Sequence, residues 1–175
     1  MGWPVCALAA LARLPPDYRR SLSAHMTKLR EDKVGDGSGY DRSVPPTSLR
    51  LEPNVSQAGT DVRVQLRFFK LTEVALDRGS LTAKVWWRMK WQDTRLAWNE
   101  SAYGGITQAE YAAVSYSDQE STEIWLPDIT PYNGKFGLMD SFDPAVARVA
   151  SSGNVQWSRP GNLEVHGCVP APVVV

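Results

Sequence analysis

Residues 81–91 read LTAKVWWRMKW, and apolar side chains occupy every second position along them. A period of two is typical of a β-strand, because successive side chains point to opposite faces of a sheet. The even-numbered positions are polar or charged with one exception, Trp86. A tryptophan on the wet face of a strand needs a partner or a ligand to cover it. The segment therefore predicts a half-buried strand and marks Trp86 as a candidate binding residue.

The segments on either side of this strand predict a mainly β chain with one helix near its start. Residues 62–68 also alternate, and four apolar side chains at helical spacing predict an amphipathic helix over 17–33. Further short strands are expected at 111–116, 123–126, 145–150 and 155–158, the last two as a hairpin. One helix followed by many short strands implies an antiparallel β-sandwich.

The composition limits the partners of the chain. It has 175 residues, with 19 Lys and Arg against 19 Asp and Glu, so the formal net charge is zero. Affinity for nucleic acid or an anionic membrane grows with clustered positive charge, so the overall balance argues against both partners. The longest apolar runs fall well short of the roughly 20 residues that cross a bilayer. The length fits one domain with its own core.

Three parts are expected along the chain. Residues 1–39 hold an apolar segment, the amphipathic helix and a Gly-rich linker, residues 40–168 the sandwich, and residues 169–175 a Pro/Val-rich tail. The apolar segment is similar to the core of a secretory signal peptide, although no Lys or Arg precedes it, and a frayed terminus is the alternative. The Gly-rich run follows a helix, which favours a flexible linker over a phosphate-binding loop.

Catalytic and metal chemistry find little support in the sequence. The two histidines and two cysteines lie far from any other group at metal-ligand spacing, and nucleophile-elbow and P-loop motifs do not occur. We therefore expect no enzyme activity, no metal and no cofactor. The aromatic residues, seven Trp and six Tyr, favour binding instead. Asn54 and Asn99 lie in N-x-S sequons and are candidate glycosylation sites if the chain is secreted.

Several short motifs occur in a fixed order from residue 85 onwards. They are VWWRMKW at 85–91, LAWN at 96–99, IWLPDI at 124–129, YN at 132–133, SSG at 151–153, PG at 160–161 and Cys168. Together they resemble the extracellular ligand-binding domain of pentameric Cys-loop channels, with nicotinic acetylcholine receptor subunits as the expected relatives. The resemblance extends over about 40–168. It implies a β-sandwich protomer on the extracellular side of the cell surface, in a homo- or hetero-pentamer that binds a small-molecule agonist.

The resemblance also assigns binding residues. Trp86 matches the loop D aromatic, with Arg88 two residues further on the same strand face, and Tyr132 matches the loop A tyrosine. Counted from the Ser-Ser-Gly turn, Arg148 and Gln156 fall at loop E positions. In this family a ligand lies between two subunits, one contributing loops A to C and its neighbour loops D to F.

Two features of these residues affect the expected ligand. Aromatic faces attract a quaternary ammonium by about 0.5–2 kcal/mol per contact, which favours a cationic or zwitterionic amine. Arg88 and Arg148 place positive charge at the same site, which favours an anionic or zwitterionic ligand, or an altered site. The alternative is that Trp86 is covered by a neighbouring subunit and binds no ligand.

The last part of the resemblance concerns structural motifs and the end of the chain. Trp125, Pro127 and Asp128 form a WxPD turn with an expected structural role, in which the carboxylate accepts local backbone donors. Cys168 matches the first cysteine of the Cys-loop, whose partner and following strands the sequence does not contain. We therefore expect an incomplete sandwich without the channel domain. The alternatives are a secreted ligand-binding protein of the acetylcholine-binding kind and a non-functional truncated product.

Overall fold

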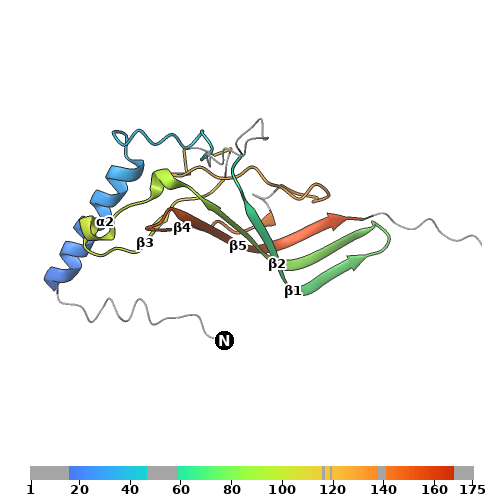
Figure 1. The fold of residues 1–175 in the computed structure, drawn as a ribbon. Coiled ribbons are helices and arrows are strands. Elements are labelled where there is room, and N and C mark those ends of the chain that lie inside the picture. The colour runs from blue at the N-terminus through green and yellow to red at the C-terminus, as the bar shows by residue number, and fades with distance from the viewer. Residues whose placement is uncertain (1–15, 47–58, 116, 119, 138–140, 168–175) are drawn as a thin grey trace, which may run out of the picture.

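The computed structural model describes residues 16–46, 59–115, 117–118, 120–137 and 141–167 (Figure 1). Their elements are, in chain order, α2 (Pro16–Val34), β1 (Arg63–Ala75), β2 (Ser80–Gln92), the 3-10 helices η1 (Thr94–Leu96) and η2 (Glu100–Tyr103), β3 (Gln108–Tyr111), β4 (Ala147–Ala150) and β5 (Asn154–His166). The strands form one antiparallel sheet in the order β1-β2-β5-β4-β3. The mainly β fold with an N-terminal helix is confirmed. Cys168, Asn54 and the two chain ends lie outside the described residues.

Helix α2 lies beside the β3 end of the sheet, far from the β1–β2 turn (Figure 1). Leu29 is buried and packs with the core, whereas Tyr18, one of the four predicted apolar positions, is half exposed in the first turn. Tyr103 of η2 donates a hydrogen bond of 2.9 Å to Asp32, which fixes the last turns of the helix. The helix ends where the Gly35 N–H donates to a carbonyl one turn earlier, before the Gly-rich segment.

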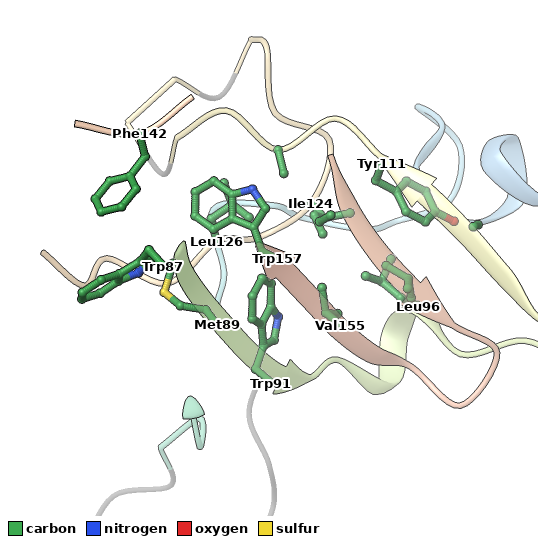
Figure 2. Close-up of a cluster of buried hydrophobic side chains, with 14 of the residues drawn as sticks. Trp87, Met89, Trp91, Leu96, Tyr111, Ile124, Leu126, Phe142, Val155 and Trp157 are labelled. Atoms are coloured by element: carbon green, nitrogen blue, oxygen red, sulfur yellow. The ribbon is translucent and has the colours of Figure 1, made fainter. Parts of the chain in front are cut away.

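Strand β2 shows the alternation that the sequence predicts. Its odd-numbered residues from Ala83 to Trp91 are buried on what we call the inner face, and its even-numbered residues point to the outer face. Figure 2 shows the inner-face side chains gathered with those of β5 and of the segment that covers the sheet. The labelled residues are Trp87, Met89, Trp91, Leu96, Tyr111, Ile124, Leu126, Phe142, Val155 and Trp157.

Irregular chain between β3 and β4 covers the inner face. Of the strand expected at 111–116 only Tyr111 is observed in a strand, as the last residue of β3, and the strand expected at 123–126 is not observed. The side chains there alternate between buried and partly buried positions, as the predicted strands would require. Their backbone groups, however, form hydrogen bonds within the loop. The Thr122 hydroxyl accepts from the N–H groups of Val114 and Ser115, and the Glu123 N–H donates to Ala112. Because these donors are satisfied locally, no ladder forms beyond β3.

The predicted hairpin forms, but its second strand is much longer than expected. β5 continues through Pro160 and Gly161 to His166. Proline is tolerated because β4 pairs only with the start of β5, as far as Trp157, so no β4 residue lies beside Pro160. Gly161 allows the covering segment to approach, since a Cβ there would lie 2.1 Å from the Ser141 carbonyl oxygen. The buried Arg159 guanidinium donates to the carbonyls of that segment and holds it in place.

Strand β1 is an edge strand of the sheet that the described residues form. Every residue before Ala75 is exposed, including those on the inner face. The inner-face side chains of β1 are Val64, Leu66, Phe68, Leu71 and Val74, which are 44–59% exposed. Within the described residues the covering segment therefore buries β2, β5 and β4 but leaves the inner face of β1 half uncovered.

Candidate ligand-binding face

Trp86 lies in the middle of β2 on the outer face of the sheet. It pairs with Arg67 of the edge strand β1 and with Pro160 of β5. Its side chain is half-buried, whereas its neighbour Trp87 points into the core. The structure therefore places Trp86 on the outer face, as the sequence predicts, and leaves part of its surface accessible.

The Trp86 ring is contacted by side chains of its own sheet. The Phe69 ring meets it at 85° with 5.3 Å between centroids, and the Arg88 guanidinium lies 4.8 Å from its centroid. A second guanidinium, that of Arg67, lies 5.6 Å from the Phe69 centroid. Two arginines thus flank two aromatic rings, an arrangement that partly explains how Trp86 is accommodated on the outer face.

Sequence reasoning missed Phe69 and Arg67. Both share the parity of the outward residues of β1, so the alternation itself could have placed them beside Trp86. Phe69 sits at a register shift, with Phe68 opposite Val85 and Lys70 opposite Lys84. The extra residue of this bulge has no direct partner on β2, and its ring packs against Trp86.

Arg148 and Gln156 lie on the same outer face, one row of residues away from Arg88. Arg148 pairs with Gln156, and Gln156 pairs with Lys90, so the row runs from β4 to β2. These residues line an open cavity of about 520 Å³, together with polar side chains of β1, β2 and β3. Trp86 and Arg88 are outside its lining, so the face has an aromatic part and a polar, cationic part.

Tyr132 lies elsewhere. Its side chain is fully exposed in a turn whose Gly134 bridges to Val165, near the end of β5. Pro160, the partner of Trp86, is five residues from Val165, or about 17 Å along the strand. The structure therefore brings together Trp86, Arg88, Arg148 and Gln156, and it does not bring Tyr132 to them within one chain.

The WxPD turn is anchored by a buried polar cluster that sequence reasoning did not identify. The Tyr40 hydroxyl accepts from the Trp125 N–H at 3.0 Å and donates to Asp93 at 2.9 Å. Asp93 is fully buried and paired with Arg95 at 2.7 Å. Burial raises the pKa of Tyr40 above its ordinary value, and the nearby Asp93 carboxylate adds to the effect. This cluster joins the chain before β1 to the chain after β2.

Two further candidate residues can be placed. The Asp128 carboxylate is exposed and makes no hydrogen bond with another described residue, in contrast to the expected acceptance of local backbone donors. Asn99 is exposed and caps η2, where its Oδ1 accepts from the Ser101 N–H at 3.1 Å. Glycosylation of Asn99 stays a prediction. Among the described residues no group of three or more His, Cys, Asp or Glu could hold a metal ion.

Comparison with known proteins assigns the class. The chain matches the model of the neurotransmitter-gated ion-channel ligand binding domain over residues 30–168, and it belongs to that family. This is a family of receptor domains and not of enzymes. The polar and aromatic outer face described above is thus found on a domain whose family binds neurotransmitters.

Individual relatives are nicotinic receptor subunits. The chain is 28% identical to the neuronal acetylcholine receptor subunit beta-4 of Mus musculus over 159 residues, covering 91% of this chain and 29% of the relative. It is 29% identical to the acetylcholine receptor subunit alpha-like 2 of Drosophila melanogaster, covering 90% and 24%. It is 31% identical to the human neuronal acetylcholine receptor subunit alpha-2, covering 70% and 20%. The chain thus spans less than a third of the length of these relatives. In the described part, no helix has the length and apolar character of a membrane span.

Proposed function

We propose that this chain acts in the extracellular part of a pentameric ligand-gated channel and contributes one side of an agonist site between neighbouring subunits. The observation that carries the proposal is the grouping of Trp86, Arg88, Arg148 and Gln156 on one outer face. Tyr132 lies toward the other end of β5. This separation fits a site in which Tyr132 faces one neighbour and the Trp86 face meets another.

The chemistry of the face favours a ligand with both charges. The indole ring of Trp86 can attract an ammonium group, while the Arg88 guanidinium, 4.8 Å from the ring centroid, can bind an acidic group. A purely cationic ligand would have to approach against Arg88, whereas the charge of Arg148 across the adjoining cavity is already paired with Glu110 at 3.2 Å. We therefore propose a zwitterionic amine as the agonist, captured at a subunit interface that favours the open channel.

A chimeric subunit tests the proposal. Residues 40–167 replace the matching segment of the mouse beta-4 subunit, and the agonist concentration that gives half-maximal current is measured in Trp86→Ala, Trp86→Phe and Lys84→Ala variants. Trp86→Ala should raise that concentration roughly 2- to 30-fold, corresponding to the loss of one cation–π contact. Trp86→Phe should retain most of the response, and Lys84→Ala, on the same face, should leave it unchanged. An unchanged response in Trp86→Ala would overturn the assignment.

A further inference from the structure

One row of paired residues crosses the outer face along the open cavity of about 520 Å³. The row takes one residue from each strand of the sheet, in the order β3, β4, β5, β2, β1. Every side chain in it is exposed, with an acid on β3 and cations on β4, β2 and β1. We call it the charged row, and its members are Glu110, Arg148, Gln156, Lys90 and Arg63.

The β3 end of the charged row is electrically neutral. The Glu110 carboxylate lies 3.2 Å from the Arg148 guanidinium, and the two residues are directly paired in the register. The backbone carbonyl of Glu110 also accepts a hydrogen bond of 3.2 Å from Arg30, which ties this end to α2. A partner that docks on the outer face therefore meets no unmatched charge at the β3 end.

The β1 end of the charged row carries unmatched positive charge. Lys90 and Arg63 are directly opposed, and like charges in that position destabilise an antiparallel pair. Asp61 lines the same cavity, but among the described residues no ion pair joins an acid to Lys90 or Arg63. An acid from outside the chain would relieve this repulsion.

The two other acids that the strands place on the outer face lie far from this cationic pair. Glu73 of β1 and Glu164 of β5 both stand opposite Thr82, which is eight residues from Lys90 along β2, or about 27 Å. Each of these two acids already forms an ion pair with a residue outside the charged row. Within the described residues, the strands therefore supply no acid to Lys90 and Arg63.

The candidate agonist site brings this cationic pair to a subunit interface. Lys90 follows Arg88 by two residues on the same face, which corresponds to about 7 Å along β2. Because the proposed function turns Trp86 and Arg88 towards a neighbouring subunit, Lys90 and Arg63 lie within the same contact, and the present inference rests on that function. Charges that lose water at an interface without finding a partner oppose association.

We propose that the neighbouring subunit supplies an Asp or Glu side chain that enters the cavity and pairs with Lys90 and Arg63. The cavity is also lined by Gln92 and Asn154, so ammonium, guanidinium and amide groups are all available to bind a carboxylate. The charged row thus selects a neighbour that carries an acid opposite its β1 end and none opposite Glu110. Subunits without that acid are disfavoured, because they leave two cations unmatched in the contact.

Zero-length cross-linking tests this pairing. The chimeric subunit described above is expressed with the human neuronal acetylcholine receptor subunit alpha-2, and isolated pentamers are treated with a carbodiimide, which joins an amine to a carboxylate in direct contact. Lys90 should become joined to an Asp or Glu of a neighbouring subunit. Lys135, 2.9 Å from Glu164 of the same chain, is the positive control for the reaction. Lys90→Arg keeps the charge without the amine, so it should lose the cross-link and keep the pentamer.

A charge exchange provides a second measurement. Lys90→Glu/Arg63→Glu should lower the amount of surface pentamer about fivefold or more, because like charges then face each other across the contact. The matched control, Lys84→Glu/Lys70→Glu, reverses the other directly opposed cationic pair of the hairpin and should assemble like the wild type. Replacing the cross-linked acid of the neighbour by Lys should restore assembly of the first variant, which excludes misfolding as the cause of its loss.

Two results would overturn the inference and leave the agonist site standing. One is a pentamer in which Lys135 is cross-linked to Glu164 but Lys90 is joined to no neighbour, and the other is an equal loss of assembly in the matched control. An unchanged agonist response in Trp86→Ala, with Lys90 joined to a neighbour, would overturn the agonist site and keep the interface. A chimeric subunit that enters no pentamer would overturn both.

Discussion

The Arg88 guanidinium lies 4.8 Å from the centroid of the Trp86 ring, on the same strand and the same face of the sheet. The chain therefore places a cation of its own against the aromatic side chain that would attract a ligand cation. Because the Arg88 guanidinium and a ligand cation compete for the same ring surface, the affinity of this face for a quaternary ammonium depends on Arg88 as well as on Trp86.

Replacing Arg88 by glutamine should make the Trp86 ring more available. We expect binding of choline to strengthen roughly 2- to 30-fold and binding of acetate to weaken, measured by NMR titration of the indole N–H resonances. Lys90→Gln removes the same charge from the same face without uncovering the ring, and it serves as the control. Equal effects of the two substitutions would show that long-range charge alone sets the preference.

Gly161→Ala should destabilise the chain. A Cβ at this position would lie 2.1 Å from the Ser141 carbonyl oxygen and 2.7 Å from the Phe142 Cα, and both are backbone atoms that cannot rotate away. We expect a loss of about 1–3 kcal/mol in the free energy of unfolding, measured by urea denaturation. The control is Gly37→Ala, where a Cβ would meet no atom within 4 Å. If the two variants unfold alike, β5 and the covering segment are not in close contact.

Tyr111→Phe should stabilise the chain at neutral pH. The Tyr111 hydroxyl is buried and has no hydrogen-bond partner among the described residues, so its removal should add about 1 kcal/mol to the free energy of unfolding. Tyr103→Phe is the matched control, because the Tyr103 hydroxyl donates to Asp32 and its loss should not stabilise. A destabilised Tyr111→Phe variant would show that the hydroxyl does have a partner.

Ionisation of Tyr111 should also lower the free energy of unfolding of the chain at alkaline pH. Burial raises the pKa of Tyr111 from 10.0 to about 12. The folded state favours the neutral phenol. The free energy of unfolding that depends on this neutral form is therefore fully present below pH 10 and is lost as the pH rises towards 12. Unfolding free energies measured between pH 9 and pH 12 should fall less steeply in Tyr111→Phe than in the wild type.

The isolated chain should self-associate through the inner face of β1. Phe68 is 59% exposed and Leu66 is 49% exposed on that face, so apolar surface is open to water. Phe68→Glu should lower the aggregated fraction in light scattering without lowering the melting temperature. Gln65→Glu adds the same charge to the outer face of the same strand and should have a smaller effect. A wild-type chain that stays monomeric in light scattering would contradict this prediction.

The regular elements could be predicted from the sequence wherever one face is buried and the other is wet. The predicted helix over 17–33 is observed as Pro16–Val34, and the predicted strand over 81–91 is observed as Ser80–Gln92. Burial alone did not identify strands between β3 and β4. There the Thr122 hydroxyl and the Glu123 carboxylate accept hydrogen bonds from backbone N–H groups. Buried and partly buried side chains therefore alternate although the backbone does not pair as a β-strand.

The candidate site was predictable in part. Strand parity marked Trp86, and the family resemblance added Arg88, Arg148 and Gln156. The pairing of β2, β5 and β4 shows that these four residues share one face of the sheet. Phe69 was missed because its role depends on a bulge, which shifts register without any Gly or Pro signal. The Tyr40 and Asp93 contact joins residues 53 positions apart, a distance that local patterns do not cover.

The bulges of β1 also determine how this edge of the sheet can be used. The register with β2 shifts between Phe68 and Lys70 and again between Leu71 and Glu73, so the longest regular run of the edge is 63–68. A strand of another chain could pair with this run for only about 20 Å before the bulge interrupted the hydrogen-bond register. The edge therefore admits one short partner and resists the long, flat stacking by which exposed strands grow into fibrils.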